Sequence, residues 1–113
     1  MIQWQLLECN AQVYQVERDS QQIPILIYKH SPRCDLSNLT KQLLEQQWDY
    51  PITAIRPYLL NVLQHKEVSN LVSEVFQEHH QSPQLLFIQQ GVCTYAADYP
   101  DITIEEFKDC VVL

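Results

Sequence analysis

The sequence predicts an α/β protein with three layers, in which a central mixed sheet of about five strands is flanked by about four helices. Two observations lead to this prediction. Short apolar runs alternate along the chain with segments in which apolar residues recur at helical spacing. Strands that alternate with helices favour right-handed crossovers and a parallel core, whereas a late hairpin adds antiparallel strands.

Composition narrows the class of protein further. The chain has 113 residues, 46% of them hydrophobic, and no Gly/Ser-rich or Pro-rich linker, so we expect one domain over residues 1–113. A formal net charge of −7 argues against nucleic acid and anionic membranes, because both require clustered Lys and Arg. The sequence shows neither a long apolar span nor a secretory signal pattern, so we expect a cytoplasmic protein.

The first third of the chain should contain a strand, a helix and a second strand. The first strand is predicted around residues 4–7, and Asn10 is placed to cap a helix that ends near Arg18. Residues 23–28 form a continuous apolar run with little alternation, which is typical of a strand covered on both faces. This second strand should therefore be central in the sheet.

The middle of the chain should contain a helix, a strand and a further helix. Apolar residues at helical spacing predict the second helix, which closes before Pro51. They are Leu36, Leu39 and Leu43. Tyr58, Leu60 and Val62 alternate as a strand does. The third helix has the most regular apolar spacing, formed by Val68, Leu71, Val72, Val75 and Phe76.

The last third should contain a hairpin and a short helix. Two apolar segments, residues 85–88 and 92–95, flank Gly91, which is the only glycine and marks the turn. Thr103 followed by Glu106 has the form of a capping box. The apolar residues of the helix that begins there are Ile104, Phe107 and Val111.

Cys34 is the strongest candidate for chemistry, since it lies between an apolar strand and a helical pattern. A sulfur at the start of a helix meets unpaired backbone N–H groups and the positive end of the dipole, which favour thiolate, the form that attacks disulfides. Ser37 stands where a dithiol enzyme has its second cysteine, so the mixed disulfide would await an external thiol. Two alternatives remain: Cys34 could be a small buried apolar residue, and Ser37 could be merely an exposed residue or one that hydrogen-bonds a backbone N–H in the first turn of the helix.

The other cysteines give no sign of a metal site or of a disulfide framework. No CxxC or CxxH spacing is present, and a reducing compartment would keep the thiols free. Cys93 on a hairpin strand and Cys110 in an apolar helix are predicted to fill the core. Cys9 lies near the end of the first strand and has no predicted role.

Several strings resemble the monothiol bacilliredoxin family, also called YtxJ-type. They are Tyr28-Lys29-His30-Ser31, Cys34-x-x-Ser37, Tyr58-Leu59-Leu60-Asn61, Val68-Ser69-Asn70 and His80-Gln81-Ser82-Pro83-Gln84. The similarity extends from about Ile23 to Phe107. It implies a thioredoxin-like fold and the reduction of mixed disulfides between proteins and the low-molecular-weight thiol bacillithiol.

The resemblance also implies roles for single residues. By it, Cys34 is the nucleophile and Pro83 a cis-proline, in a loop with Ser82 that approaches the sulfur. The dipeptide alone does not predict this, because only ~5 to 6% of X-Pro bonds in folded proteins are cis and proline is tolerated at the start of a strand. His80 would place an imidazole near Cys34, whereas His79 is explained by a solvated helix end.

Asp35 departs from the family pattern, in which proline usually follows the cysteine. A carboxylate beside the sulfur disfavours thiolate, although Asp in a first helical turn suits the dipole. Lys29, His30 and Arg33 are close enough in sequence to offset its charge. The candidate substrate-binding residues are Arg33, Asp35, His80, Ser82 and Pro83.

We therefore predict a monothiol thiol-disulfide oxidoreductase that acts through Cys34, without a bound cofactor or metal. Its partners would be thiolated client proteins and a small thiol such as bacillithiol, and the protein would be a monomer or weak dimer. Two alternatives remain at this point. One is a redox-inactive thioredoxin-like protein-binding module, which Asp35 makes conceivable. The other is an iron-sulfur or metal carrier that uses Cys34 of two subunits.

Overall fold

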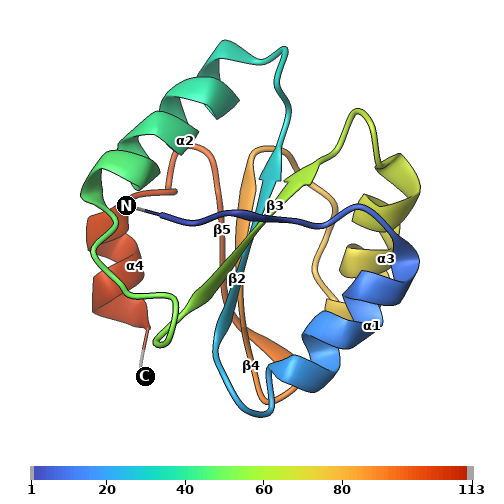
Figure 1. Ribbon diagram of the computed structural model, residues 1–113. Coiled ribbons are helices and arrows are strands. Elements are labelled where there is room, and N and C mark those ends of the chain that lie inside the picture. The colour runs from blue at the N-terminus through green and yellow to red at the C-terminus, as the bar shows by residue number, and fades with distance from the viewer. Residues whose placement is uncertain (1, 112–113) are drawn as a thin grey trace.

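The computed structural model of the protein describes residues 2–111, and its helices and strands follow the predicted order (Figure 1). They are β1 (Gln5–Leu6), α1 (Asn10–Asp19), β2 (Ile25–His30), α2 (Asp35–Gln47), β3 (Arg56–Asn61), α3 (Lys66–Phe76), β4 (Gln84–Gln89), β5 (Val92–Asp98) and α4 (Ile104–Cys110).

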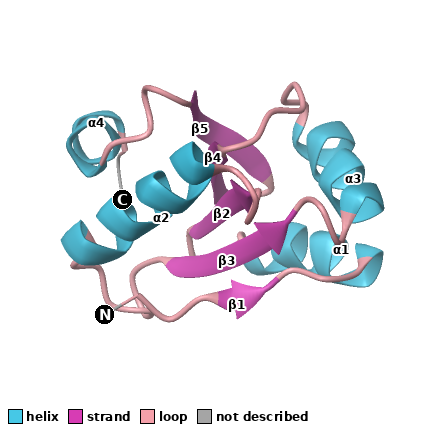
Figure 2. Ribbon diagram, turned by 90° about the horizontal axis from the view of Figure 1, so that it is seen from above, coloured by secondary structure: helices cyan, strands magenta, loops and turns pink. Residues whose placement is uncertain are grey.

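The strands form one mixed sheet in the order β1-β3-β2-β4-β5. β1 and β2 pair with β3 in parallel, while β4 pairs antiparallel with both β2 and β5. Every residue of β2 is buried, which confirms the prediction of a central strand covered on both faces. Figure 2 shows the three layers, with α1 and α3 on one face of the sheet and α2 and α4 on the other.

The alternation of β2 divides the core in two. Ile25 and Ile27 pack in the cluster beneath α1 and α3, whereas Leu26 and Tyr28 pack in the cluster beneath α2 and α4. Aromatic rings of α4 and the sheet contact one another in the second cluster, where the Phe87 and Phe107 centroids lie 5.3 Å apart.

The predicted boundaries of α1 and β2 are wrong by one or two residues, and β2 begins at Ile25 rather than at residue 23. Asn10 is the first residue of α1, and Cys9 is its N-cap, because the Gln12 side chain satisfies the backbone N–H groups of both Glu8 and Cys9. β2 extends to His30, since its ladder with β3 includes residues 29 and 30 although both are polar.

The buried face of α2 is not the one that its leucines indicate. Leu36, Leu39 and Leu43 are 44%, 51% and 47% exposed. The buried residues of the helix are instead Ser37, Thr40 and Leu44. The helix is therefore turned by about 100°, one residue, from the orientation that would bury its leucines.

The hairpin and the last helix agree with their sequence signals. Gln90 and Gly91 take positive φ angles of 51° and 80° between β4 and β5, as a tight hairpin turn requires. Thr103 is the N-cap of α4, and its side chain accepts a hydrogen bond from the Glu106 backbone N–H. Among residues 2–111, none of the helices combines the length and apolar character needed to cross a bilayer.

Candidate functional site

Cys34 lies at the N-cap of α2, directly after a short loop that leaves β2. Its backbone N–H donates to the Ser31 carbonyl at 3.0 Å, and its own carbonyl accepts from the Asn38 N–H at 3.0 Å. The Asn38 side chain also donates to the Pro32 carbonyl at 2.9 Å, so both ends of the loop are held. The thiol is free and partly exposed.

The segment with Ser82 and Pro83 lies at the same end of the sheet. Gln84 begins β4 opposite Lys29 of β2, so the residues just before Gln84 lie beside the carboxyl end of β2. Figure 1 shows this end at the top, where α2 begins. The Ser82–Pro83 peptide bond is cis, the isomer that the resemblance implies, and the Tyr99–Pro100 bond is also cis. Two segments far apart in sequence thus lie at the same end of β2.

Ser37 lies inside the protein and connects three parts of the site. Its hydroxyl oxygen accepts from the Ser31 backbone N–H at 3.0 Å and is hydrogen-bonded to His30 Nδ1 at 2.7 Å. Its backbone carbonyl accepts from the Tyr28 hydroxyl at 2.9 Å. The hydroxyl of Ser37 therefore joins β2, the loop and α2 from within the fold.

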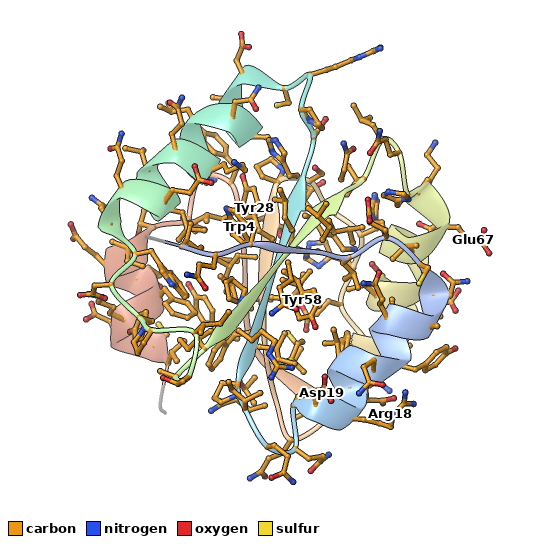
Figure 3. All side chains as sticks on the ribbon, in the orientation of Figure 1. Trp4, Arg18, Asp19, Tyr28, Tyr58 and Glu67 are labelled. Atoms are coloured by element: carbon orange, nitrogen blue, oxygen red, sulfur yellow. The ribbon has the colours of Figure 1, made fainter. Side chains whose placement is uncertain are left out.

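Tyr28 and His30 form the base of this network. Tyr28 lies beside Trp4 between the sheet and α2 (Figure 3), and its ring stacks on that of His30 with centroids 5.8 Å apart. Burial raises the pKa of Tyr28 to about 12, the Ser37 hydrogen bond lowers it in part, and the charge of Cys34 raises it again. The tyrosine is therefore an un-ionised donor close enough to the thiol to sense its charge.

Burial, and then the charge of Lys41, lower the pKa of the His30 imidazole, while the charge of Glu45 opposes the shift. The Ser31 N–H already donates to Ser37 Oγ, so the Ser37 proton is free to go to His30 Nδ1. His30 also lines a hollow of about 120 Å³ with Asn61 and His65. Leucines also line this hollow, so the His30 imidazole borders a small opening of mixed character beside the site.

These contacts explain the orientation of α2. The side chains of Tyr28 and His30 point from β2 toward the helix, and buried polar groups are costly unless they are hydrogen-bonded. Ser37 supplies both partners, so it must face the sheet, and the leucines then face solvent. Sequence reasoning missed the role of His30. The signal was available, because Leu26, Tyr28 and His30 share one face of an extended strand.

His80 contacts the opposite face of the sheet from Ser37. Its Nδ1 lies 3.2 Å from Ser69 Oγ on α3 and 3.4 Å from Lys29 Nζ. His79 instead is hydrogen-bonded through Nε2 to the Asp98 carboxylate at 2.7 Å. His80 therefore ties the loop before β4 to α3.

Lys29 is fully buried beneath α3. Its ammonium donates to the Ser69 carbonyl at 3.0 Å and to Ser73 Oγ at 2.8 Å. Burial lowers the pKa of Lys29 to about 8. Since successive residues of β2 point to opposite faces, Lys29 lies on the other side of the sheet from Tyr28 and His30.

Arg33 and Asp35 are exposed on either side of Cys34.

Cys93 is half-buried against the cluster beneath α1 and α3, as predicted, and burial raises the pKa of its thiol to about 11. The prediction for Cys110 is wrong, because its thiol is exposed on the outer side of α4, near Glu106. Cys9 is exposed at the start of α1. No set of three or more His, Cys, Asp or Glu within residues 2–111 is grouped as a metal site requires.

Comparison with known proteins gives a family and a fold. The profile of the family described as BrxC, monothiol bacilliredoxin BrxC, matches residues 5–107. No curated protein matches the chain.

Solved structures resemble the chain at low identity. One described as a putative oxidoreductase with a thioredoxin fold has a TM-score of 0.74 at 23% identity, over 93% of this chain and 90% of that one. Thioredoxin from Trypanosoma brucei brucei has a TM-score of 0.71 at 11% identity, over 95% of this chain and 89% of that one. Thioredoxin from Malassezia sympodialis has a TM-score of 0.69 at 15% identity, over 87% of this chain and 80% of that one. The three-layer arrangement is thus a thioredoxin fold.

Proposed function

Because this chain belongs to the monothiol bacilliredoxin family, we propose that it reduces mixed disulfides between cytoplasmic proteins and a low-molecular-weight thiol, bacillithiol in the first place, through Cys34. The observation that carries the proposal is the pairing of Cys34 with Ser37. Cys34 is a partly exposed thiol at the mouth of α2, and the residue three positions on is a buried serine. This chain therefore offers one sulfur at that helix start and no second sulfur there to complete a disulfide.

The reaction has two thiol exchanges. The Cys34 thiolate attacks the small-thiol sulfur of the mixed disulfide, so a new disulfide joins Cys34 to the small thiol and the client leaves as a thiolate. An external thiol then attacks that disulfide, which returns Cys34 to thiolate and releases the small thiol in a disulfide with the external one. The number of disulfide bonds stays constant: the sulfur of the external thiol is oxidised into the new disulfide as the client sulfur is reduced to thiolate, and no cofactor bound to the protein takes part.

Residues around the sulfur would hold the substrate. The backbone near Ser82 and Pro83 lies at the end of β2, where it can pair with an extended client segment. Arg33 and Asp35 flank the thiol and would contact the small thiol or the client chain. His80 would act through the loop that it ties to α3.

Intact mass spectrometry tests the proposal. Wild-type protein is incubated with a bacillithiol-modified protein and, separately, with a glutathione-modified one, and the adduct on this chain is weighed and mapped. We expect one small-thiol adduct on Cys34 and release of the reduced client. Cys34→Ser should abolish the transfer, whereas the triple variant Cys9→Ser, Cys93→Ala and Cys110→Ser should retain it.

Two results would replace the proposed mechanism. A disulfide that joins Cys34 to another cysteine of the chain would show that the protein contains its own resolving thiol. Failure of Cys34 to accept the small thiol from either substrate would favour a redox-inactive binding module, in which Asp35 suppresses the thiolate.

A further inference from the structure

The exposed leucines of α2 form a continuous apolar surface beside the thiol. We call Leu36, Leu39 and Leu43 the leucine stripe. They are spaced i, i+3 and i+7, so they lie along one side of the helix over about 10 Å. The stripe begins two residues after Cys34, and each of its side chains is at least 44% exposed.

The stripe continues into a crevice between α2 and α4. The crevice has a volume of about 160 Å³, and Leu43 and Leu44 line its α2 side. Residues 102–105 line the other side, and two of them, Ile102 and Ile104, are apolar. An apolar path thus leads from Leu36 in the first turn of α2 to the start of α4. Figure 2 shows the two helices side by side on one face of the sheet.

Acidic side chains border this path. Asp35 is exposed at its Cys34 end, and Glu105 lines the crevice at its other end. Glu106 and Asp109 are also exposed on α4. Of the lysines nearby, Lys41 is paired with Glu45 at 2.8 Å and Lys108 with Asp49 at 2.8 Å. Arg33 is the exposed cation beside Cys34. The surface is therefore apolar along its middle and mainly acidic at its border.

This charge distribution selects among possible occupants. A second copy of the chain would bring two acidic borders together, and each copy already has a net charge of −7. A small hydrophilic thiol attached to Cys34 has few apolar atoms to bury against the path. A protein segment with apolar side chains and Lys or Arg around them matches both the stripe and its border.

We propose that the leucine stripe is the docking surface for the protein half of the mixed disulfide, and that the preferred clients carry an amphipathic basic segment next to the modified cysteine. The inference rests on the proposed function of Cys34 and adds the substrate class. Docking on the stripe would hold the disulfide at the start of α2, whereas attack on a small disulfide needs no such contact.

Matched peptide disulfides test the proposal. Three peptides carry a glutathione-modified cysteine next to a helical segment, which is apolar with Lys, apolar with Glu, or polar with Lys. Glutathione disulfide serves as the small substrate. We expect wild-type protein to take glutathione from the apolar basic peptide about tenfold faster than from the other two peptides.

Substitution of the stripe provides the second arm. Leu36→Ser, Leu39→Ser and Leu43→Ser together should remove the preference for the apolar basic peptide, while the rate with glutathione disulfide stays within about twofold. The matched control is Leu63→Ser with Val92→Ser, because these side chains are also about half exposed, at 52% and 56%, but lie outside α2. The control should keep the preference. Circular dichroism checks that both variants are folded.

The outcomes separate the two proposals. If wild-type protein takes the small thiol neither from these four substrates nor from their bacillithiol-modified counterparts, the proposed function fails and the docking proposal falls with it. If it reacts with glutathione disulfide but treats the three peptides alike, only the docking proposal is overturned. Sedimentation over a range of protein concentrations gives a third reading, since a dimer that forms through the stripe and is lost in the stripe variant would identify a second copy as the occupant.

Discussion

At the scale of single residues, Ser37 shows how a side chain can belong to both the site and the fold. Its hydroxyl oxygen accepts a hydrogen bond from the Ser31 N–H and is hydrogen-bonded to His30 Nδ1. The Ser37 side chain is fully buried. A cysteine at this position would place a sulfur inside the fold, where a thiol is a weaker hydrogen-bonding group than a hydroxyl. The serine thus has two effects: it holds the loop that precedes Cys34, and it leaves Cys34 without a partner sulfur at this position.

Ser37→Ala should lower the free energy of unfolding by about 1 to 3 kcal/mol, because the Ser31 N–H and His30 Nδ1 lose a buried partner. Thr40→Val is the matched control on the same buried face. Its hydroxyl donates back to the Leu36 carbonyl within the helix and also interacts with the Tyr28 side chain, but neither the Ser31 N–H nor the His30 imidazole loses a partner, so the cost should be under about 1 kcal/mol. Urea denaturation measures both, and equal costs would contradict the network.

Lys29 predicts a dependence of stability on pH. Burial lowers its pKa from 10.5 to about 8 in the folded protein. Between these two values the unfolded chain binds a proton that the folded protein does not, so the stability of the wild type should rise with pH. Compared with Lys29→Met, the gain across this window should approach about 3 kcal/mol. Urea denaturation of both proteins from pH 7.5 to 10.5 measures it, and a difference that is flat or falls with pH would refute it.

Asp35 should restrain the reactivity of Cys34. Asp35→Asn removes a negative charge next to the sulfur and keeps the size of the side chain, so alkylation of Cys34 by iodoacetamide near neutral pH should accelerate by about two- to fivefold. Asp109→Asn, an exposed substitution on α4, should leave the rate unchanged. A rate that is equal or slower in Asp35→Asn would show that other charges govern the thiol.

At the scale of secondary structure, α2 marks the limit of what the sequence predicts. Spacing located the helix, the central strand and the Gly91 turn, since each depends on local apolar periodicity or backbone freedom. Which face of α2 is buried depends on the hydrogen bonds of Ser37 with Tyr28 and His30. These contacts form only when the helix packs on β2, so they are not visible in the local sequence of the helix. Apolar periodicity cannot predict the buried face here, because it counts apolar residues and takes no account of buried polar side chains that need hydrogen-bond partners.

The same reasoning applies to the site. The position of Cys34 follows from a strand and helix boundary, so local signals predict it. The contact of His80 with Ser69 and Lys29 depends on the packing of α3 on the sheet, which local sequence does not specify. His30 would have been found only by extending the predicted strand, which ended at Tyr28, through its polar end.

The orientation of α2 leads to a paired prediction. Leu44→Ala should destabilise the protein by about 2 to 5 kcal/mol, since this side chain is 3% exposed within the core. Leu39→Ala on the same helix should change stability by less than about 0.5 kcal/mol, because Leu39 is exposed. Thermal or urea denaturation measures the pair. A reversed order would place the leucine stripe in the core and exclude it as a docking surface.

At the scale of the whole molecule, polar side chains are buried at one end of the sheet on both of its faces. Tyr28, His30 and Ser37 are hydrogen-bonded beneath α2, while Lys29 and Gln84 lie on the opposite face. Within residues 2–111, the Ser82 hydroxyl and the Gln84 side-chain carbonyl are buried without a hydrogen-bond partner. Buried polar groups of this kind are costly, and they lie at the end of the sheet that carries both Cys34 and the loop before β4.

The packing of the whole molecule predicts how Cys93 reacts. Burial raises its pKa from 9.0 to about 11, so the folded protein at pH 8 has about a hundredfold less thiolate at Cys93 than an exposed thiol would have. Iodoacetamide at pH 8 should therefore modify Cys93 far more slowly than the exposed Cys9. In urea above the unfolding midpoint the two rates should converge, because the core that holds Cys93 is lost. Peptide mapping after timed alkylation gives both rates, and rapid modification of Cys93 in native buffer would mean that β5 does not stay packed against the core beneath α1 and α3.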